Sequence, residues 1–237
     1  MAQKQNPSPH DTTRRASVPA GPSDSTKAGA GALSGPAVYT GPRFRTILAD
    51  PPWETHQRGP LGASRHYRLM SLERIKALPV AQLAQPDAHL WLWVTNATLR
   101  AGYDLAEAWG FTPRSPLTWI KPRFTLGNYL RNATEHLLLA TRGRAPVAYK
   151  SQPTWMFAPL QDHSHKPEEQ FAIIERVSQG PYLELFARRR PPSNKSWAVW
   201  GNQIDSDIHI PGYPVPRYGK KAEQDSSSGS CATEERS

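Results

Sequence analysis

A single carboxylate stands where an apolar run of the chain meets two consecutive prolines. Residues 47–49 (Ile-Leu-Ala) are typical of a β-strand, and Asp50, Pro51, Pro52 and Trp53 follow them. Because a proline nitrogen carries no hydrogen and cannot extend a sheet ladder, we expect the strand to end at Asp50. Ligands of open α/β sheets bind at the carboxyl ends of strands, so this arrangement predicts a site at Asp50.

These residues suit the capture of an amino group. The Asp50 carboxylate and the carbonyls of Pro51 and Pro52 accept hydrogen bonds, and the proline nitrogens offer no competing donors. Two acceptors that hold both hydrogens of an exocyclic amine such as adenine N6 favour a pyramidal nitrogen, which aims its lone pair at an electrophile. Trp53 and Tyr67 are candidates to stack on the base, as aromatic side chains do with flipped or unpaired bases. The electrophile has to come from a cofactor.

The elements that must position these residues alternate along the chain, which predicts βα units and a mainly parallel sheet. Apolar runs predict strands at residues 43–49, 89–95, 117–121, 136–141, 182–187 and 197–200. Apolar spacing predicts helices over residues 71–85, broken near Pro79, over 99–109 before Gly110, and from about 166 to 177. Residues 142–164 have no clear period, and we interpret them as a candidate lid.

Length and composition predict one domain between two tails. The chain has 237 residues, enough for one well-buried domain. Residues 1–40 and 206–237 hold few bulky apolar side chains, so we expect a disordered first tail, a domain over residues 41–205 and a mostly disordered second tail. The only cysteine, Cys231, excludes disulfides within the chain and thiolate metal clusters. His163 and His165 lack an acidic cluster, so we expect no metal site.

The charge of the chain favours a polyanionic partner. Lys and Arg number 29 against 20 Asp and Glu, which gives a net charge of +9 and a pI near 9.8. Such a balance is typical of nucleic-acid binding, although a solvated basic surface would look the same. No apolar stretch approaches the ~20 residues that cross a bilayer, so we expect a cytoplasmic protein with no membrane partner.

Nine short motifs, in their order along the chain, resemble the MT-A-type adenine-N6 methyltransferases. This family includes the catalytic subunit of the messenger-RNA N6-adenosine writer and related bacterial and phage enzymes. The motifs lie between about residues 43 and 205 and are Asp50-Pro51-Pro52-Trp53, Leu92-Trp93-Val94-Thr95, Trp109-Gly110-Phe111, Trp119-Ile120-Lys121, Glu135-His136, His165-Lys166-Pro167, Ile174-Glu175-Arg176, Glu184-Leu185-Phe186-Ala187-Arg188 and Gly201-Asn202-Gln203. The stretch from Ala187 to Asn202 looks more like the bacterial and phage branch, which favours DNA over RNA as the substrate.

The resemblance implies a Rossmann-like α/β fold with helices on both faces of the sheet, a permuted motif order and S-adenosylmethionine as the cofactor. By the same resemblance, Asp50 orients the target amine beside the cofactor and the residues at 51–53 complete the catalytic motif. Lys166 lies near the carboxylate end of the cofactor, and Asn202 and Gln203 bind its ribose hydroxyls. Phe186 and Arg188 line the cofactor pocket. The chain departs from many methyltransferases in having Ala187 where several relatives carry glycine, and in having no G-x-G turn.

Four further residues are candidates for substrate binding: Tyr67, Lys121, Arg131 and Glu135. Arg131 belongs to a set of arginines that could contact phosphates or simply face solvent. Glu135 either touches the substrate or braces Lys121 or another base. Each feature also has a plainer interpretation, since an aspartate can merely end a strand and Lys166 can be a solvated lysine at a helix start.

The leading hypothesis is methylation of adenine N6 in a nucleic acid. The alternative is a catalytically inactive scaffold subunit that presents nucleic acid to an active partner, although a scaffold has no need to keep Asp50, Lys166, Asn202 and Gln203 together. A third hypothesis is methylation of a small molecule or a protein. The resemblance also implies a homodimer or a paired subunit.

Overall fold

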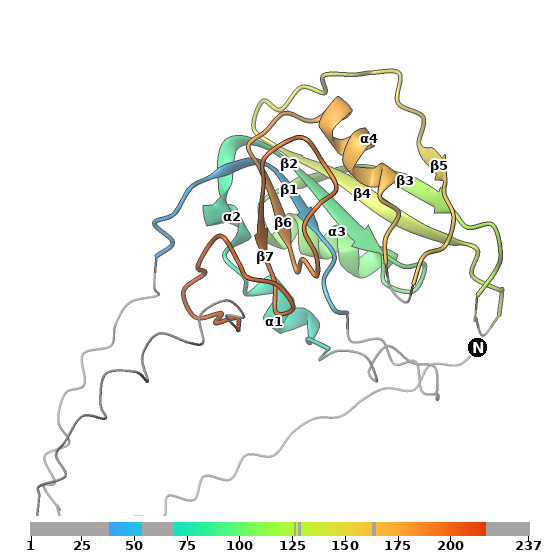
Figure 1. The fold of residues 1–237 in the computed structure, drawn as a ribbon, viewed down its shortest axis with the longest axis horizontal. Helices are drawn as coiled ribbons and strands as arrows, with labels where there is room; N and C mark the ends of the chain where they lie inside the picture. Colours follow the sequence, from blue (N-terminus) through green and yellow to red (C-terminus); the bar gives the residue numbers. More distant parts are fainter. Residues whose placement is uncertain (1–37, 54–68, 126, 128, 163–164, 217–237) are drawn as a thin grey trace, which may run out of the picture. The chain divides into compact units, whose positions relative to one another are not determined.

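The computed structural model describes residues 38–53, 69–125, 127, 129–162 and 165–216. Within these residues the elements are β1 (Phe44–Ala49), α1 (Leu72–Lys76), α2 (Val80–Leu83), β2 (Ala84–Val94), α3 (Leu99–Ala108), β3 (Thr112–Ile120), β4 (Thr134–Arg142), β5 (Trp155–Phe157), α4 (Glu169–Val177), β6 (Tyr182–Leu185) and β7 (Trp197–Trp200). The strands form one sheet in the order β5-β3-β4-β2-β1-β6-β7 (Figure 1).

The sheet is mainly parallel, as the sequence predicts. Strand β1 pairs in parallel with β2 and β6, β6 with β7, and β3 with β5. Strand β4 is antiparallel to both of its neighbours, β2 and β3. The carboxyl ends of the parallel strands therefore meet the start of β4 at one edge of the sheet, which brings Asp50, Lys121, Glu135 and Phe186 to the same side.

Helices cover both faces of the sheet. Alternate residues of β2 divide between two core clusters, with Leu90 and Leu92 in one and Trp91 and Trp93 in the other. The first cluster packs against α1, α2 and α3, and the second against α4, which lies on the opposite side of the sheet from α3 (Figure 1). This two-sided cover explains why β2 has no polar face beyond His89.

The turns follow the local chemistry of the sequence. Ser71 precedes α1 and its Oγ accepts a hydrogen bond from the Arg74 backbone N–H at 3.4 Å. Pro79 separates α1 from α2, as predicted. Gly110 follows α3 with a φ of +80°, a conformation that glycine adopts without strain.

Three segments differ from the prediction because their patterns are weak. Strand β2 begins at Ala84, five residues before its predicted start at residue 89, so the predicted helical segment over residues 71–85 ends at Leu83. The segment 142–164, interpreted as an aperiodic lid, contains strand β5, which is only three residues long and shows no detectable alternation. Strand β3 begins at Thr112, five residues before the predicted start. Pro113 and Pro116 argue against a strand there, but a register shift between Pro113 and Ser115 accommodates the first of them.

The packed core also extends past both predicted domain boundaries. Tyr39 is buried before residue 41, and Ile208 and Ile210 are buried after residue 205. All three belong to the core cluster on the α3 face. No helix in the described part of the chain is both long enough and apolar enough to cross a membrane.

Candidate active site

Four charged side chains of alternating sign meet at the carboxyl edge of the sheet. Lys166 Nζ donates to Asp50 Oδ2 at 2.9 Å and lies 3.5 Å from Glu135 Oε2. Lys121 Nζ donates to Glu135 Oε1 at 2.6 Å. The four groups therefore form one continuous network, in which Lys166 joins the strand-end aspartate to the acid of β4.

The network sets the protonation of its two acids. Burial raises the pKa of Asp50, and Lys166 offsets part of that rise. Burial alone would also raise the pKa of Glu135, but Lys166 and Lys121 together hold the pKa of Glu135 below its ordinary value. Glu135 is thus the fixed anion that holds both lysines, and Asp50 is the acid whose charge is less well compensated.

Two tryptophans hold the turn after β1. Trp53 donates from Nε1 to the Trp93 carbonyl at 3.1 Å, and Trp93 donates from Nε1 to Gln170 Oε1 at 2.7 Å. Lys166 Nζ lies 5.4 Å from the centre of a Trp93 ring, a cation–π contact. Trp53 packs partly buried against the core and lines neither cavity described below, so its ring anchors the turn.

The proline carbonyls are already engaged by the backbone. Pro51 O accepts from the Trp53 N–H at 2.8 Å, and Pro52 O accepts from the Met70 N–H at 2.9 Å. The sequence predicts these carbonyls as acceptors for the substrate. Since a carbonyl has two lone pairs, each retains capacity for one more donor.

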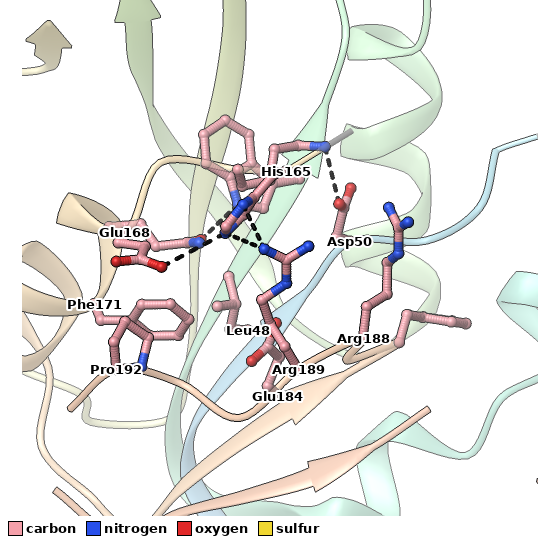
Figure 2. Close-up of a pocket in the computed structure, with 13 residues that line it drawn as sticks. Leu48, Asp50, His165, Glu168, Phe171, Glu184, Arg188, Arg189 and Pro192 are labelled. Atoms are coloured by element: carbon pink, nitrogen blue, oxygen red, sulfur yellow. Dashed lines mark hydrogen bonds and ion pairs between the residues drawn. The ribbon is translucent and has the colours of Figure 1, made fainter. Parts of the chain in front are cut away.

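Two cavities border Asp50. The α4 cavity is small, about 50 Å³, and the C-terminal cavity is larger, about 680 Å³. Asp50, Phe186 and Arg188 line both cavities. Further residues of the α4 cavity are Leu48, Trp93, His165, Lys166, Glu168, Gln170, Phe171, Glu184, Arg189 and Pro192 (Figure 2). Further residues of the C-terminal cavity are Pro51, Pro52, Leu69, Met70, Arg74, Trp200, Gly201, Asn202, Gln203 and Gly212–Pro216.

The residues that follow β6 form a wall common to the two cavities, and they lie close to the end of β7. Phe186 has a φ of +64°, which is unusual for a bulky residue and marks local strain where β6 ends. A Cβ on Gly201 would lie 2.0 Å from the Ala187 carbonyl oxygen, so only glycine allows this close approach. Arg188 then reaches across, and its Nε donates to Gln203 Oε1 at 2.7 Å.

Glu184 is a site residue to which the sequence assigns no role. It lies on β6 beside Leu48 of β1 and lines the α4 cavity (Figure 2). Burial, reinforced by the charge of Asp50, raises the pKa of Glu184 to about 8. Its Oε2 is buried and has no hydrogen-bond partner in the described part of the chain. An acid in the middle of an apolar strand is the sequence signal that could have identified it.

The structure brings together most, but not all, of the predicted site residues. Asp50, Lys166, Phe186 and Arg188 line the α4 cavity, while Asn202 and Gln203 line the C-terminal cavity. Lys121 and Glu135 line neither cavity and join the site through Lys166. Arg131 is exposed, lies over the Phe124 ring at 5.7 Å and lines neither cavity. Tyr67 lies outside the described residues.

The donors and acceptors of the two cavities fit the parts of S-adenosylmethionine. The C-terminal cavity offers aromatic walls and the two amides of Asn202 and Gln203, which suit a base and a diol. The α4 cavity offers basic groups for a carboxylate and acidic groups for a cation. One of the acids is Glu184, whose Oε2 has no partner among the described residues. Asp50 stands where the two cavities meet.

Comparison with known proteins gives relatives of one kind. Over 175 residues, or 69% of this chain, it is 33% identical to the N(6)-adenosine-methyltransferase MT-A70-like protein of Drosophila melanogaster. It is 30% identical over 181 residues, or 71% of this chain, to the N(6)-adenosine-methyltransferase catalytic subunit METTL3 of Homo sapiens. It is 28% identical over 197 residues, or 74% of this chain, to the N(6)-adenine-specific methyltransferase METTL4 of Mus musculus.

These relatives are much longer than the region that matches. The alignments cover 27% of the Drosophila protein, 29% of the human protein and 40% of the mouse protein. The family model for MT-A70 matches residues 44–203, which include Asp50-Pro51-Pro52-Trp53 and all four residues of the charged network. On this match, the chain belongs to the MT-A70 family.

Proposed function

We propose that this protein is an S-adenosylmethionine-dependent methyltransferase that acts on N6 of adenine in a nucleic acid. The observation that carries the proposal is the 2.9 Å bond from Lys166 to Asp50, at the point where the two cavities meet. A carboxylate held by a lysine where the two cavities meet is suited to grip an amine beside a cofactor that extends into both cavities. The names of the Drosophila, human and mouse relatives support the same chemistry.

Each residue of the network has a positioning task. Lys166 holds Asp50 Oδ2, which leaves Oδ1 as the oxygen that the lysine does not use and that can accept a hydrogen of the amine. Glu135 and Lys121 fix Lys166 in turn. When bound, S-adenosylmethionine supplies a methyl group on a sulfonium centre. The protein therefore has mainly to align the amine, and alignment alone is worth a large part of such a barrier.

The cofactor contacts divide between the cavities. Asn202 and Gln203 can donate to and accept from the ribose hydroxyls. Arg188 and Arg189 line the α4 cavity and can bind the carboxylate. Lys166, assigned to that carboxylate by resemblance, is already paired with two acids. We therefore propose that it acts chiefly on Asp50.

We propose DNA as the preferred polymer, on the likeness of the stretch from Ala187 to Asn202 to the bacterial and phage branch. The net charge of +9 suits either DNA or RNA. The human relative is named for adenosine, the ribonucleoside, and the mouse relative for adenine, a base that DNA and RNA share, so these names add no support for DNA. The cytoplasmic location stays a prediction.

A paired subunit is part of the proposal. The name of the human relative calls that protein a catalytic subunit. Here the edge of the sheet exposes Ile120 of β3 and Trp155 and Phe157 of β5, and Ile120 pairs with Phe157 in register. An uncovered apolar edge of this kind suits a second copy of the chain or a related subunit. Light scattering on the purified chain distinguishes a monomer from a dimer.

The inactive scaffold is the competing hypothesis, and one observation weighs against it. A scaffold has no need for an intact network from Asp50 to Lys121, yet all of its ion pairs are in place. The decisive experiment incubates the full chain with methyl-labelled S-adenosylmethionine and matched pools of single-stranded DNA, duplex DNA and RNA. Mass spectrometry of the digested nucleosides then identifies the product.

We expect N6-methylated adenine nucleoside, with a higher yield from DNA. Pools of the same length that lack adenine are the control and should give no label. Label in RNA alone would overturn the DNA preference but keep the reaction. Binding of the pools without label in any nucleoside would favour the scaffold.

A further inference from the structure

One wall of the C-terminal cavity comes from a segment outside the family match. The family model ends at residue 203, whereas Gly212–Pro216 lines the cavity. The sequence predicts a mostly disordered tail from residue 206. The structure instead buries Ile208 and Ile210 in the core, so the residues that follow them are held against the sheet.

The segment is fastened to the end of β7. Asp207 N–H donates to the Val199 carbonyl at 2.9 Å, and Asp207 Oδ2 accepts from the Val199 N–H at 2.9 Å. Ser206 Oγ accepts from the Gly201 N–H at 3.0 Å. The chain then turns, with the Tyr213 N–H bonded to the Ile210 carbonyl at 3.0 Å. Tyr213 and Val215 are both partly buried against the apolar cluster that includes Trp200, and all three residues line the C-terminal cavity.

Trp200 has a buried donor without an acceptor. Its side chain packs edge-on against Phe186, with ring centres 5.5 Å apart. Its Nε1 is buried and has no hydrogen-bond partner in the part of the chain that the structure describes. A buried N–H without an acceptor is destabilising, so a ligand that brings an acceptor to this wall gains by supplying it.

The lining of the two cavities indicates which end of the methyl donor lies in which cavity. Its reactive centre must face Asp50, and its amino-acid end suits the charged α4 cavity. The ribose belongs at Asn202 and Gln203. The adenine ring of the donor would then extend into the rest of the C-terminal cavity, whose lining includes Trp200, Tyr213 and Val215.

We propose that Trp200, Tyr213 and Val215 form the subsite for the adenine ring of the methyl donor. The inference rests on the proposed function. Tyr213, Val215 and Trp200 supply apolar and aromatic contacts for the ring, and a ring nitrogen is the acceptor that the buried Trp200 indole N–H lacks among the described residues. The segment after residue 205 is thereby part of the cofactor site.

The test measures binding, not turnover. Isothermal titration of the full chain uses two ligands: S-adenosylhomocysteine, and 5′-methylthioadenosine, which keeps the adenosyl group and lacks the amino acid. We expect Tyr213→Ala to weaken both ligands about tenfold, the usual range for loss of one stacking partner of a base. Trp200→Phe keeps an aromatic ring and removes the N–H, and it should weaken both ligands about fivefold.

The control is Tyr103→Ala on α3. Tyr103 is also partly buried against the same core cluster but lines neither cavity, so its loss should leave both dissociation constants unchanged. If Tyr213→Ala fails to fold, Val215→Ala replaces it, with an expected loss of about threefold. Unchanged binding of both ligands in the cavity variants would overturn the inference, as would a rise in KM for nucleic acid with unchanged ligand binding. No binding by the wild-type chain would instead remove the proposed function.

Discussion

The two cavities beside Asp50 are built in opposite ways. The α4 cavity is about 50 Å³ and is lined mainly by charged and polar side chains, all of them between residues 48 and 192. The C-terminal cavity is about 680 Å³ and draws part of its wall from residues 212–216, beyond the family match. The strands thus fix the charged groups around Asp50, while a terminal segment beyond the family match completes the larger cavity.

Removing the charge of Asp50 is the strongest test of that division. In Asp50→Asn the side chain keeps its size but no longer pairs as an anion with Lys166 or attracts a hydrogen of the amine. We expect kcat to fall by about 100-fold or more, the usual range for loss of one preorganised electrostatic group. Binding of S-adenosylhomocysteine should stay measurable, because Asn202, Gln203 and the other residues that line the C-terminal cavity are unchanged.

Asp104→Asn, an exposed change on α3, is the matched control and should keep full activity. Single-turnover kinetics together with calorimetry separate the two effects. Full activity in Asp50→Asn would end the assignment of Asp50. Complete loss of ligand binding with a native unfolding profile would show that the two cavities are not separable.

Glu184 provides a test that depends on pH. Because the pKa of Glu184 is raised to about 8 in the folded state, the folded chain binds a proton there that the unfolded chain has lost above about pH 4.5. The free energy of unfolding should therefore fall as pH rises toward 8 and level off above it. Glu184→Gln is neutral throughout, so between pH 5 and 8 its unfolding free energy should fall less than that of the wild type, by on the order of 2 kcal/mol.

Urea unfolding at pH 5, 6, 7 and 8 measures this difference. Glu168→Gln removes an exposed carboxylate from the lining of the same cavity and serves as the control. Parallel curves for Glu184→Gln and the wild type would mean that Glu184 is ionised in the folded chain. The α4 cavity would then carry a permanent second anion beside Asp50.

The same contrast explains what the sequence could predict. Asp50 stands at a strand end that Pro51 and Pro52 predict, so local sequence is enough to place it. The bond from Lys166 to Asp50 joins residues 116 positions apart and depends on the order of strands in the sheet. Sequence resemblance accordingly assigns Lys166 to the cofactor and does not indicate its bond to Asp50. For Glu135 the sequence leaves substrate contact and a bracing role open, and the structure shows its bond to Lys121.

The C-terminal wall was missed for a different reason. Ile208 and Ile210 are two apolar residues in a polar, proline-containing stretch, too few to give a period. Their burial depends on the surface left open beside β7, which local sequence does not encode. The sequence also does not show that the N–H of Trp53 is bonded to the Trp93 carbonyl, 40 positions away, and the stacking of Trp53 on a base stays a prediction.

The smallest expected effect concerns the ion pair that fastens this wall. Arg190 Nη2 donates to Asp207 Oδ1 at 2.9 Å, and both side chains are largely exposed. Arg190→Met should therefore lower the free energy of unfolding by no more than about 1 kcal/mol. Asp207→Ala should cost more, about 1–2 kcal/mol, because Asp207 also accepts the Val199 N–H.

Urea unfolding and calorimetry with S-adenosylhomocysteine test this pair in the full chain. Since Ile208 and Ile210 still anchor the segment in Arg190→Met, ligand affinity should change by less than about twofold, a difference below ~0.4 kcal/mol. A loss as large as that expected for Tyr213→Ala would show that the surface pair, and not the buried isoleucines, sets the position of the wall. The larger cavity would then depend on exposed charges as much as the smaller one depends on buried ones.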